Sequence, residues 1–179
     1  VARDGRVLEI ASGTGEHGAF LTESLPGLEW TYSDIDQAGL DSQKAWRAAS
    51  GHDRLHGPLA LDASLPDWGE AEAARPWDVV VSMNMVHIAP FAVAEGLFAG
   101  AGRVLATGGR LFLYGPFARK GVIAPSNAAF RESLQRRNPE WGVRDLDKEL
   151  LPLASLGGLE LRHVTDMPAN NLAVVFERV

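Results

Sequence analysis

The chain has 179 residues, of which 46% are hydrophobic and 22% are charged, with 17 Lys and Arg against 23 Asp and Glu. This composition is typical of one globular domain and argues against disordered and fibrous classes. The net charge of −6 argues against tracking of a nucleic-acid backbone or an anionic membrane. The chain has no cysteine, which excludes disulfides, thiolate metal sites and cysteine nucleophiles and fits a cytoplasmic location.

Neither a membrane span nor a leader is indicated. No apolar run approaches about 20 residues, and the start "VARDGRVLEI" lacks a signal-peptide pattern. Because the sequence does not begin with Met, we expect a native N-terminal segment before residue 1. We expect residues 1–179 to form a single domain, and the sequence leaves the oligomeric state open.

The first two thirds of the chain alternate between strand-like and helical patterns, which is typical of repeated β-α units and a parallel sheet. The run "WDVVVSM" is apolar throughout, as in a strand buried on both faces. Helical spacing after this run and the pair Gly108-Gly109 indicate a crossover helix that ends before the next strand. We expect strands at residues 6–11, 29–34, 58–63, 77–83 and 110–115, and helices at 16–25, 37–49 and about 94–105.

The regular alternation of strand-like and helical patterns ends at about residue 115. The connection "PFARKGVIAPS" is long, and long loops in compact domains are often functional. We expect a helix near residues 127–137 and another from Asp145, as its N-cap, to about Leu156. Alternating strands at residues 159–166 and 171–179 would then close the chain as a hairpin.

The stretch "LEIASGTGEHGAF" places Gly13, Gly15 and Gly18 at the spacing G-x-G-x-x-G directly after an apolar run. Such a turn lets backbone N–H groups approach a ligand, and it serves dinucleotides and S-adenosylmethionine alike. A dinucleotide site would also need an acid about 20 residues further on for the ribose, and Asp34 meets that condition. Glu16 favours S-adenosylmethionine, because a carboxylate at the helix entrance repels a pyrophosphate and suits a cationic sulfonium.

Glu9, just upstream of the turn, adds a second negative charge near the expected cation. Structural explanations stay open: Glu16 complements the helix dipole, Gly18 serves packing, and Asp34 or Asp36 caps the second helix.

These motifs resemble the class I S-adenosylmethionine-dependent methyltransferases and, more closely, a smaller methyltransferase-like family of uncharacterised function. The resemblance covers nearly the whole chain. The motifs that carry it, in order, are "LEIASGTGEHGAFL", "YSDID", "LDAS", "NMVHIAPF", "GLFAGAGRVL", "GGRLFLYGPF", "SNAAFRESLQRRNPEWGVRD" and "MPANNLAVVF".

The resemblance implies an α/β Rossmann-like fold with seven strands in the order 3-2-1-4-5-7-6, strand 7 antiparallel, and helices on both faces. It implies that the motif from Glu9 to Gly15 holds the methionine half of S-adenosylmethionine. Asp34 would bind the ribose hydroxyls, and Asp62 with Ala63 the adenine. The residues expected to bind the cofactor are Glu9, Ala11, Ser12, Gly13, Gly15, Asp34, Ile35, Asp62, Ala63, Asn84 and Met85.

Ligands of open α/β sheets bind beyond the carboxyl ends of the strands. This rule selects the loops "NMVHIAP", "GPFARKGVIAPSN" and "MPANN", which we expect to meet at one cleft. His87 lies on the first of them and, with an ordinary pKa near 6.5, is a candidate general base whose activity would fall as pH drops through that value. The alternative is that His87 orders its loop. We expect substrate contacts from His87, Tyr114, Phe117, Asn127 and Asn170.

These candidates also have structural explanations. Tyr114, a second candidate catalytic residue, also suits a structural role at a strand end. Asn127 is equally suited to cap its helix, and Asn170 and Asn171 suit a turn.

Basic residues gather in the last third of the chain, and they indicate either a solvated face or capture of a substrate carboxylate or phosphate. They are Arg119, Lys120, Arg131, Arg136 and Arg137. No aromatic run interleaves them, so nucleic acid is not favoured. We expect no metal site, because His52 and His56, the one suggestive pair, lie in a polar stretch that reads as a loop.

The leading hypothesis is a methyltransferase that uses S-adenosylmethionine on an oxygen or nitrogen nucleophile of a small molecule or side chain. A non-catalytic module that binds S-adenosylmethionine and acts through partners is the alternative. A nicotinamide-dependent oxidoreductase is less favoured, because neither Tyr32 nor Tyr114 has the lysine four residues on that a short-chain enzyme needs.

Overall fold

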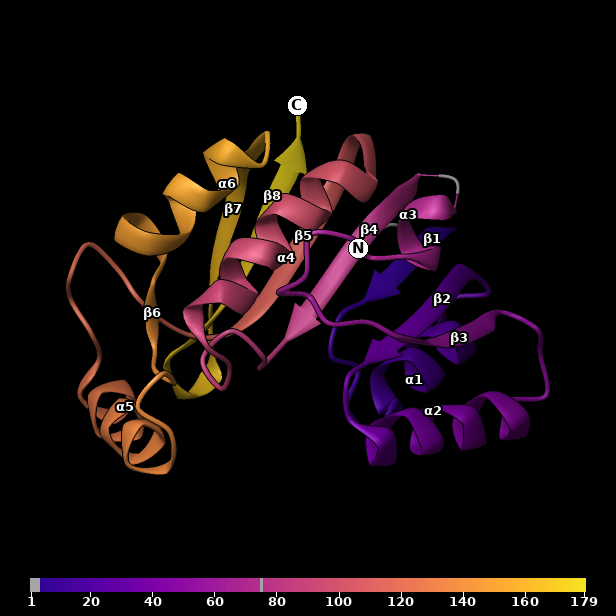
Figure 1. The fold of residues 1–179 in the computed structure, drawn as a ribbon, viewed down its shortest axis with the longest axis horizontal. Helices are drawn as coiled ribbons and strands as arrows, with labels where there is room; N and C mark the ends of the chain where they lie inside the picture. Colours follow the sequence, from indigo (N-terminus) through magenta and orange to yellow (C-terminus); the bar gives the residue numbers. More distant parts are fainter. Residues whose placement is uncertain (1–3, 75) are drawn as a thin grey trace.

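The computed structural model describes residues 4–74 and 76–179. Figure 1 shows one twisted sheet in which the strands follow the order β3-β2-β1-β4-β5-β8-β7. The strands are β1 (Asp4–Glu9), β2 (Gly27–Asp34), β3 (Leu55–Ala60), β4 (Trp77–Met83), β5 (Leu105–Ala118), β6 (Arg144–Asp145), β7 (Leu159–Met167) and β8 (Asn171–Arg178).

The helical segments are α1 (Glu16–Ser24), α2 (Gln37–Ala49), α3 (Glu70–Ala73), α4 (Phe91–Val104), α5 (Pro125–Arg137), the wide turn η1 (Leu146–Leu150), α6 (Leu151–Leu156) and the short η2 (Pro168–Asn170).

The expected strand order is confirmed. The strands β1 to β5 pair in parallel, and β8 runs antiparallel between β5 and β7. The sequence did not predict β6, a two-residue strand that pairs with Phe117 and Ala118 at the end of β5 and shifts the later strand numbers by one. The α/β Rossmann-like methyltransferase fold is therefore the fold of this chain.

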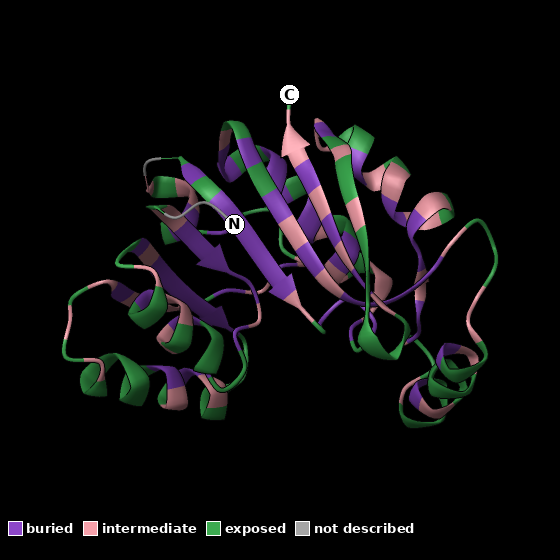
Figure 2. Cartoon of the chain, turned by 180° about the vertical axis from the view of Figure 1, so that it is seen from behind, coloured by how far each residue is buried: buried purple, intermediate pink, exposed green. Residues whose placement is uncertain are grey.

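Helices cover both faces of the sheet. One face of β1 and β2 packs against α1, and the other face of the central strands packs against α4 (Figure 1). Figure 2, the view from behind, shows largely buried central strands between these layers. The strand β4 explains this arrangement, because Val80 belongs to one hydrophobic cluster while Val79 and Val81 belong to the other. The expectation of a strand buried on both faces is confirmed.

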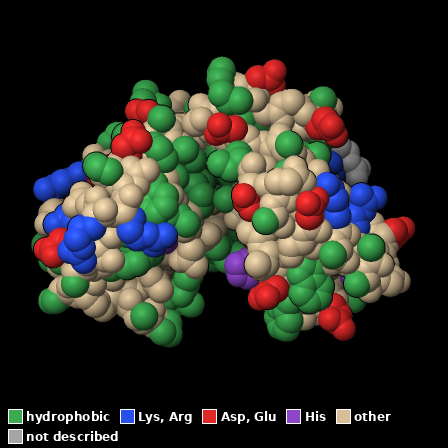
Figure 3. Space-filling view, turned by 60° about the horizontal axis from the view of Figure 1, so that its bottom comes forward, with side chains coloured by type: hydrophobic (Ala, Val, Ile, Leu, Met, Phe, Trp, Pro, Cys, Tyr) green, Lys and Arg blue, Asp and Glu red, His purple; other side chains and the backbone are tan. Residues whose placement is uncertain are grey.

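The carboxyl ends of the parallel strands lie at one edge of the sheet, at the bottom of Figure 1. Figure 3 turns this edge forward and shows a hollow between two lobes, with Lys and Arg side chains on both of them. In Figure 1 the lobe at this edge beyond β5 is formed by α5, and the other by α1 and α2. The fold thus opens a crevice where the glycine turn and the later loops end.

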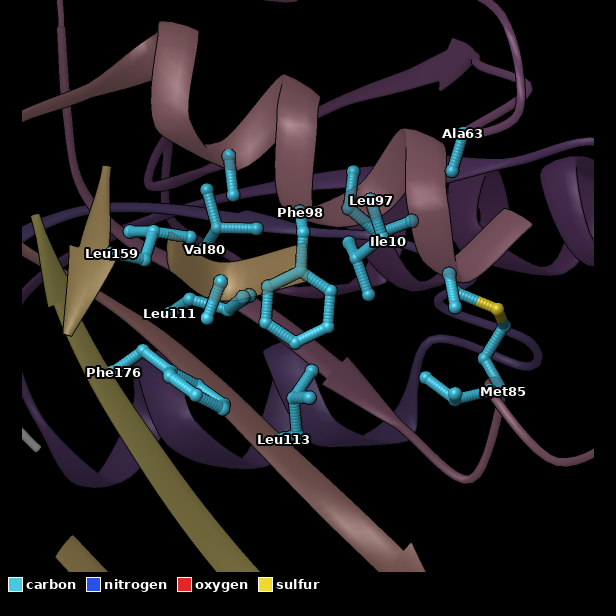
Figure 4. Packing of buried hydrophobic residues seen from close by; sticks show 14 of the residues in the cluster. Ile10, Ala63, Val80, Met85, Leu97, Phe98, Leu111, Leu113, Leu159 and Phe176 are labelled. Atoms are coloured by element: carbon cyan, nitrogen blue, oxygen red, sulfur yellow. The ribbon is translucent and has the colours of Figure 1, made fainter. Parts of the chain in front are cut away.

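The larger core cluster centres on Phe98 of α4. Its ring meets the ring of Phe176 edge to face, with centroids 5.1 Å apart and an interplanar angle of 89°. Figure 4 shows Phe98 pointing down toward Leu111 and Leu113 of β5. Edge-to-face aromatic pairs add about 1 kcal/mol beyond the area that they bury. This contact joins the crossover helix to the antiparallel strand β8.

Close backbone approaches define the position of α4. A Cβ at Gly96 would collide with the carbonyl of Ala63, and a Cβ at Gly100 would collide with the ring of Trp68. A Cβ at Gly102 would collide with the carbonyl of Gly157. The helix therefore contacts segments that precede and follow it in the chain.

Several expected boundaries were wrong. The strand β3 begins at Leu55 and ends at Ala60 instead of covering residues 58–63, so His56 lies in a strand rather than in a loop. The pair Gly108-Gly109 does not end the crossover but lies inside β5, where the register with β4 shifts between Trp77 and Val79. Asn127 does not cap α5, which begins two residues earlier at Pro125. Asp145 does cap the helical segment that follows it, as expected.

Candidate functional site

The glycine turn between β1 and α1 is held in a left-handed conformation, with φ of 56° at Gly13 and 89° at Gly15. A side chain at Gly13 would meet open space, so the turn presents its backbone to the crevice. The amide of Gly13 donates to Asp34 Oδ2 at 2.8 Å, and its carbonyl accepts from Gln43 Nε2 at 2.9 Å. Ala11, just before the turn, also has a positive φ, 58°, which is uncommon outside glycine. The turn is thus fixed by the end of β2 and by α2.

Asp34 is buried and organises the end of β2. Its Oδ1 accepts hydrogen bonds from the amides of Ile35 and Asp36 at 2.8 and 3.0 Å, in addition to the Gly13 bond to Oδ2. Ile35, by contrast, is 72% exposed. The alternative role as cap of the second helix falls to Asp36, whose Oδ2 accepts from Gly39 N at 3.0 Å. A buried acid and an exposed apolar side chain therefore lie next to each other beside the glycine turn.

Glu9 is the last residue of β1 and is buried just before the turn. Its side chain is 1% exposed; Trp30 Nε1 donates to Oε2 at 3.0 Å, and His17 Nδ1 lies 3.1 Å from Oε1. Its backbone carbonyl accepts from the hydroxyls of Ser12 and Ser33. The carboxylate of Glu9 therefore has protein partners for both oxygens. Glu16 is exposed at the start of α1.

The expected adenine residues follow β3 and β4. Asp62 Oδ1 accepts from the amide and the hydroxyl of Ser64, so this carboxylate shapes a tight turn. Ala63 is 5% exposed and packs under α4. After β4, Asn84 is exposed with a φ of 56°, and Met85 is buried.

His87 is buried on the loop after β4, with 6% of its surface exposed. Its ring meets Phe130 of α5 edge to face, at a centroid distance of 5.6 Å, and lies over the backbone of Gly115. Burial, with a smaller contribution from the positive charge of Arg144, lowers the pKa of His87 to about 4. The ring is therefore neutral at pH 7, and the expected fall of activity near pH 6.5 does not fit the folded protein.

Arg144 holds the loop that carries His87. Its guanidinium donates to the carbonyls of Val86 and Ala89 on that loop, at 3.4 and 2.8 Å, and to the carbonyl of Glu140 at 2.7 Å. The amide of Gly142 donates to the carbonyl of His87 at 3.0 Å. The sequence analysis missed Arg144, because no spacing rule connects it to a loop more than 50 residues away.

The three loops expected to meet do contact one another. The backbone amide of Asn84 donates to the backbone carbonyl of Tyr114. The side-chain hydroxyl of Tyr114 accepts a hydrogen bond from Asn171 Nδ2 at 3.2 Å. Asn127 of α5, which is 4% exposed, donates from Nδ2 to the carbonyl of Asn170 at 2.9 Å, and Asn170 donates to the hydroxyl of Ser126.

Phe117 lies apart from these polar contacts. It is 6% exposed and belongs to the larger hydrophobic core.

Two of the five basic residues singled out from the sequence contact other side chains of the protein. Arg119 forms a two-bond ion pair with Asp147, at 2.7 and 3.2 Å, and this pair lowers the pKa of Asp147. Arg137 lies over the ring of Trp141, 5.2 Å from its centroid. Two of the five basic residues therefore already have intramolecular contacts, which weakens the idea of a shared anion site.

Two hollows lie on the sheet away from these loops. One, of about 780 Å³, borders β3 and reaches Asp62, and the other, of about 570 Å³, lies over Val79, Val81 and Phe112. Within residues 4–74 and 76–179 no three His, Asp or Glu side chains gather as a metal site would require. None of the described helices has the length and apolar character needed to cross a membrane.

Several solved structures similar to this chain are methyltransferases. An O-methyltransferase family 2 protein from Planctomyces limnophilus, in complex with apigenin, matches 98% of the chain at a TM-score of 0.80 and 19% identity. The S-adenosylmethionine-dependent methyltransferase SibL in its apo form matches 98% at 0.78 and 18% identity. CalO1, a methyltransferase in calicheamicin biosynthesis in its SAH-bound form, matches 100% at 0.77 and 17% identity.

The chain spans 50% to 51% of the length of these three proteins. At such low identity the match defines the fold, which is that of S-adenosylmethionine-dependent methyltransferases. The model of one protein family matches residues 1–178. The chain belongs to this family, which is described as "Protein of unknown function (DUF938)".

Proposed function

We propose that the chain binds S-adenosylmethionine and transfers its methyl group to an oxygen or nitrogen nucleophile of a small molecule or side chain. The observation that carries the proposal is the hydrogen bond from Gly13 to Asp34. It joins the glycine turn to the acid at the end of β2, directly beside the exposed Ile35. The resemblance gives the methionine half to the glycine turn and the ribose to Asp34, and it counts Ile35 among the cofactor residues while giving the adenine to Asp62 with Ala63.

The residues fit an adenosine. Ile35 offers an exposed apolar surface on which a planar base can lie, and Asp34 offers a carboxylate to a ribose. An ionised carboxylate has about four acceptor positions, and three backbone amides use three of those of Asp34. One position is left, so we propose that Asp34 accepts a hydrogen bond from one ribose hydroxyl rather than from the two that we expected.

Bound S-adenosylmethionine supplies an electrophilic methyl group on a cationic sulfonium. The work of the chain is to orient the acceptor and exclude water, which lowers a barrier by about 7–11 kcal/mol when the reacting atoms are well placed. His87, neutral and weakly basic, can accept a hydrogen bond from the acceptor but is a poor proton acceptor. This site suits an acceptor whose nucleophilic atom carries no proton, such as a carboxylate.

The cofactor assignment is tested by thermal unfolding with S-adenosylhomocysteine and with NAD. A ligand that binds the native state raises the melting temperature by mass action. We expect a rise with S-adenosylhomocysteine and none with NAD, and an equal or larger rise with NAD would favour an oxidoreductase. Metabolite extracts incubated with methyl-labelled S-adenosylmethionine would then identify the acceptor.

A module that binds S-adenosylmethionine without turnover is the second candidate. It is favoured by one observation: no carboxylate within the described residues hydrogen-bonds His87, so the ring lacks the partner that orients many catalytic histidines. Binding of S-adenosylhomocysteine without transfer of label to any extract component is the outcome expected for this candidate.

A further inference from the structure

The contact between His17 and Glu9 lies next to the glycine turn and is not used by the proposed function. Glu9 is a fully buried carboxylate at the end of β1, and its partners come from two other elements. Trp30 of β2 donates to one oxygen, and His17 of α1 lies beside the other at 3.1 Å. An isolated buried carboxylate is costly, so a positive charge on His17 stabilises it.

His17 is placed where it can act on the turn. It follows Gly15 by two residues and lies in the first turn of α1. The hydroxyl of Tyr32 donates to the carbonyl of Gly15 at 2.7 Å, and Gly18 packs against Trp30 and Tyr32 with no room for a Cβ. Of these three contacts between the start of α1 and the sheet, the His17–Glu9 pair is the one that can lose a proton near neutral pH.

The groups that face His17 all favour its protonated form. The charged groups are Glu9 from β1 and Glu16 from α1. Tyr32 from β2 has no charge to oppose them, because burial raises its pKa and keeps it neutral. The hydrogen bond with Glu9 raises the pKa of His17, against a smaller opposing effect of burial, and the charges of Glu9 and Glu16 raise it further. The side chain is 53% exposed, so the ring exchanges its proton with water directly.

We propose that His17 is a positioning residue for the cofactor: its imidazolium pairs with Glu9 and holds the turn from Ser12 to Gly15 in the form that binds the methionine half. This inference rests on the proposed function. When the proton leaves, the negative charge of Glu9 lies uncompensated next to the turn. That charge, buried without its partner, loosens the start of α1 and with it the turn that binds the methionine half, so cofactor affinity falls as pH rises.

The direction of the pH dependence follows from linkage. A histidine whose pKa is raised by folding stabilises the protein fully below its unfolded pKa, about 6.5, and loses that contribution as pH rises through the folded value. Ligand affinity that depends on the same proton has the same direction. The pair therefore predicts tighter binding in mild acid than in mild alkali.

The experiment is calorimetric titration with S-adenosylhomocysteine at pH 6 and pH 8.5. For the wild type we expect affinity to fall about three- to fivefold over this range, the size of a half-exposed ion pair. His17→Gln should bind at pH 6 with the weakened affinity of the wild type at pH 8.5 and show no further fall. His163→Gln, an exposed histidine on β7, is the matched control and should keep the wild-type profile.

A charge-retaining variant separates positioning from folding. His17→Lys carries a positive charge through pH 8.5, so it should bind without the alkaline fall, a result that a purely structural role would not produce. This variant and the wild-type profile decide the question even if His17→Gln does not fold.

Equal affinity and equal pH profiles for the wild type and His17→Gln would overturn this inference and leave the proposed function standing. Absence of S-adenosylhomocysteine binding by the wild type at both pH values would overturn the proposed function and this inference with it.

Discussion

The two halves of the crevice use polar groups in different ways. On the side of β1 and β2, the buried carboxylates of Glu9 and Asp34 are each surrounded by donors from the protein. On the side of β5 and β8, the contacts are made by amides and a tyrosine hydroxyl, and His87 carries no charge at pH 7. We call the first the fixed half. We call the second the neutral half after these uncharged contacts, although the charged Arg119 and Arg144 also lie in it.

This difference in hydrogen bonding indicates which kind of ligand each half suits. Carboxylates that accept backbone amides fix a loop before any ligand arrives, because losing such a bond in a buried place is costly. Single hydrogen bonds between neutral groups contribute less and can be exchanged for bonds to a ligand. The fixed half suits one constant cofactor, and the neutral half suits an acceptor that supplies its own charge.

The largest effect is expected at Asp34. Asp34→Ala should weaken binding of S-adenosylhomocysteine by about 2–4 kcal/mol, because a charge-assisted bond is lost and the turn is released. It should also lower stability, because three backbone amides lose their acceptor. Calorimetry and urea unfolding measure the two effects.

Asp36→Ala is the matched control, since it removes only the cap of α2 and should cost about 1 kcal/mol of stability. If both variants bind S-adenosylhomocysteine like the wild type, the description of this half as a cofactor holder is wrong.

Asn127 tests the neutral half. Asn127→Ala removes a buried amide that joins α5 to the connection before β8, and leaves the carbonyl of Asn170 without this donor. We expect a loss of about 1–3 kcal/mol of stability with little change in cofactor affinity. Urea unfolding and calorimetry check this, and Ser126→Ala, an exposed neighbour, should have a smaller effect. A cofactor affinity that falls as far as in Asp34→Ala would remove the distinction between the halves.

Substitution of His87 tests whether a residue of the neutral half takes part in methyl transfer as a base. An ordinary general base contributes about 10²–10⁴ to a rate, and for a ring with so low a pKa we expect His87→Gln to cost only about tenfold. Between pH 6 and pH 8 the transfer rate of the wild type should not follow a histidine titration. A steep rate increase around pH 6.5 that disappears in the variant would show that His87 is a base after all.

The lowered pKa of His87 also predicts how the stability of the protein depends on pH. Folding lowers the pKa of His87 to about 4 from an unfolded value of about 6.5. The neutral ring therefore contributes stability in full above pH 6.5, and that contribution is lost as pH falls from 6.5 toward 4. Urea unfolding at pH 7 and pH 5 should show a smaller acid loss for His87→Gln than for the wild type.

The smallest effect is expected at Tyr114. Tyr114→Phe removes the acceptor of a single hydrogen bond from Asn171 in a partly buried place, and should cost about 1 kcal/mol of stability. Cofactor binding should not change. Thermal unfolding is sufficient for the measurement, and a loss of methyl transfer without a loss of stability would instead give Tyr114 a direct role in orienting the acceptor.

The order of the strands could be predicted because the patterns that mark strands and helices are local and repeat along the chain. The strand at Trp77–Met83 and the helix at Gln37–Ala49 match their predicted bounds, since an apolar run and a capping Asp36 fix them. The short β6 and α3 were missed because two- and four-residue elements have no periodicity to read. The register shift near Gly108-Gly109 was also missed, because it depends on pairing with another strand.

The candidate site was less predictable. The motif placed Glu9 near the cofactor, but the partners that bury its carboxylate, Trp30 and His17, follow from the direction of a side chain rather than from spacing. The lowered pKa of His87 depends on its burial and on Arg144, which is distant in the sequence. Chemistry-bearing residues can thus be found from a motif, but their charge depends on the packing.

The three glycines that allow α4 to approach its neighbours also affect how the helix forms. Each glycine inside a helix costs about 1 kcal/mol relative to alanine, and isolated helices of this length are already marginal in water. The compensating contacts lie at Ala63 and Trp68, made earlier in synthesis, and at Gly157, made later. The central helix should therefore gain its full set of compensating contacts only when the chain has been synthesised beyond residue 157.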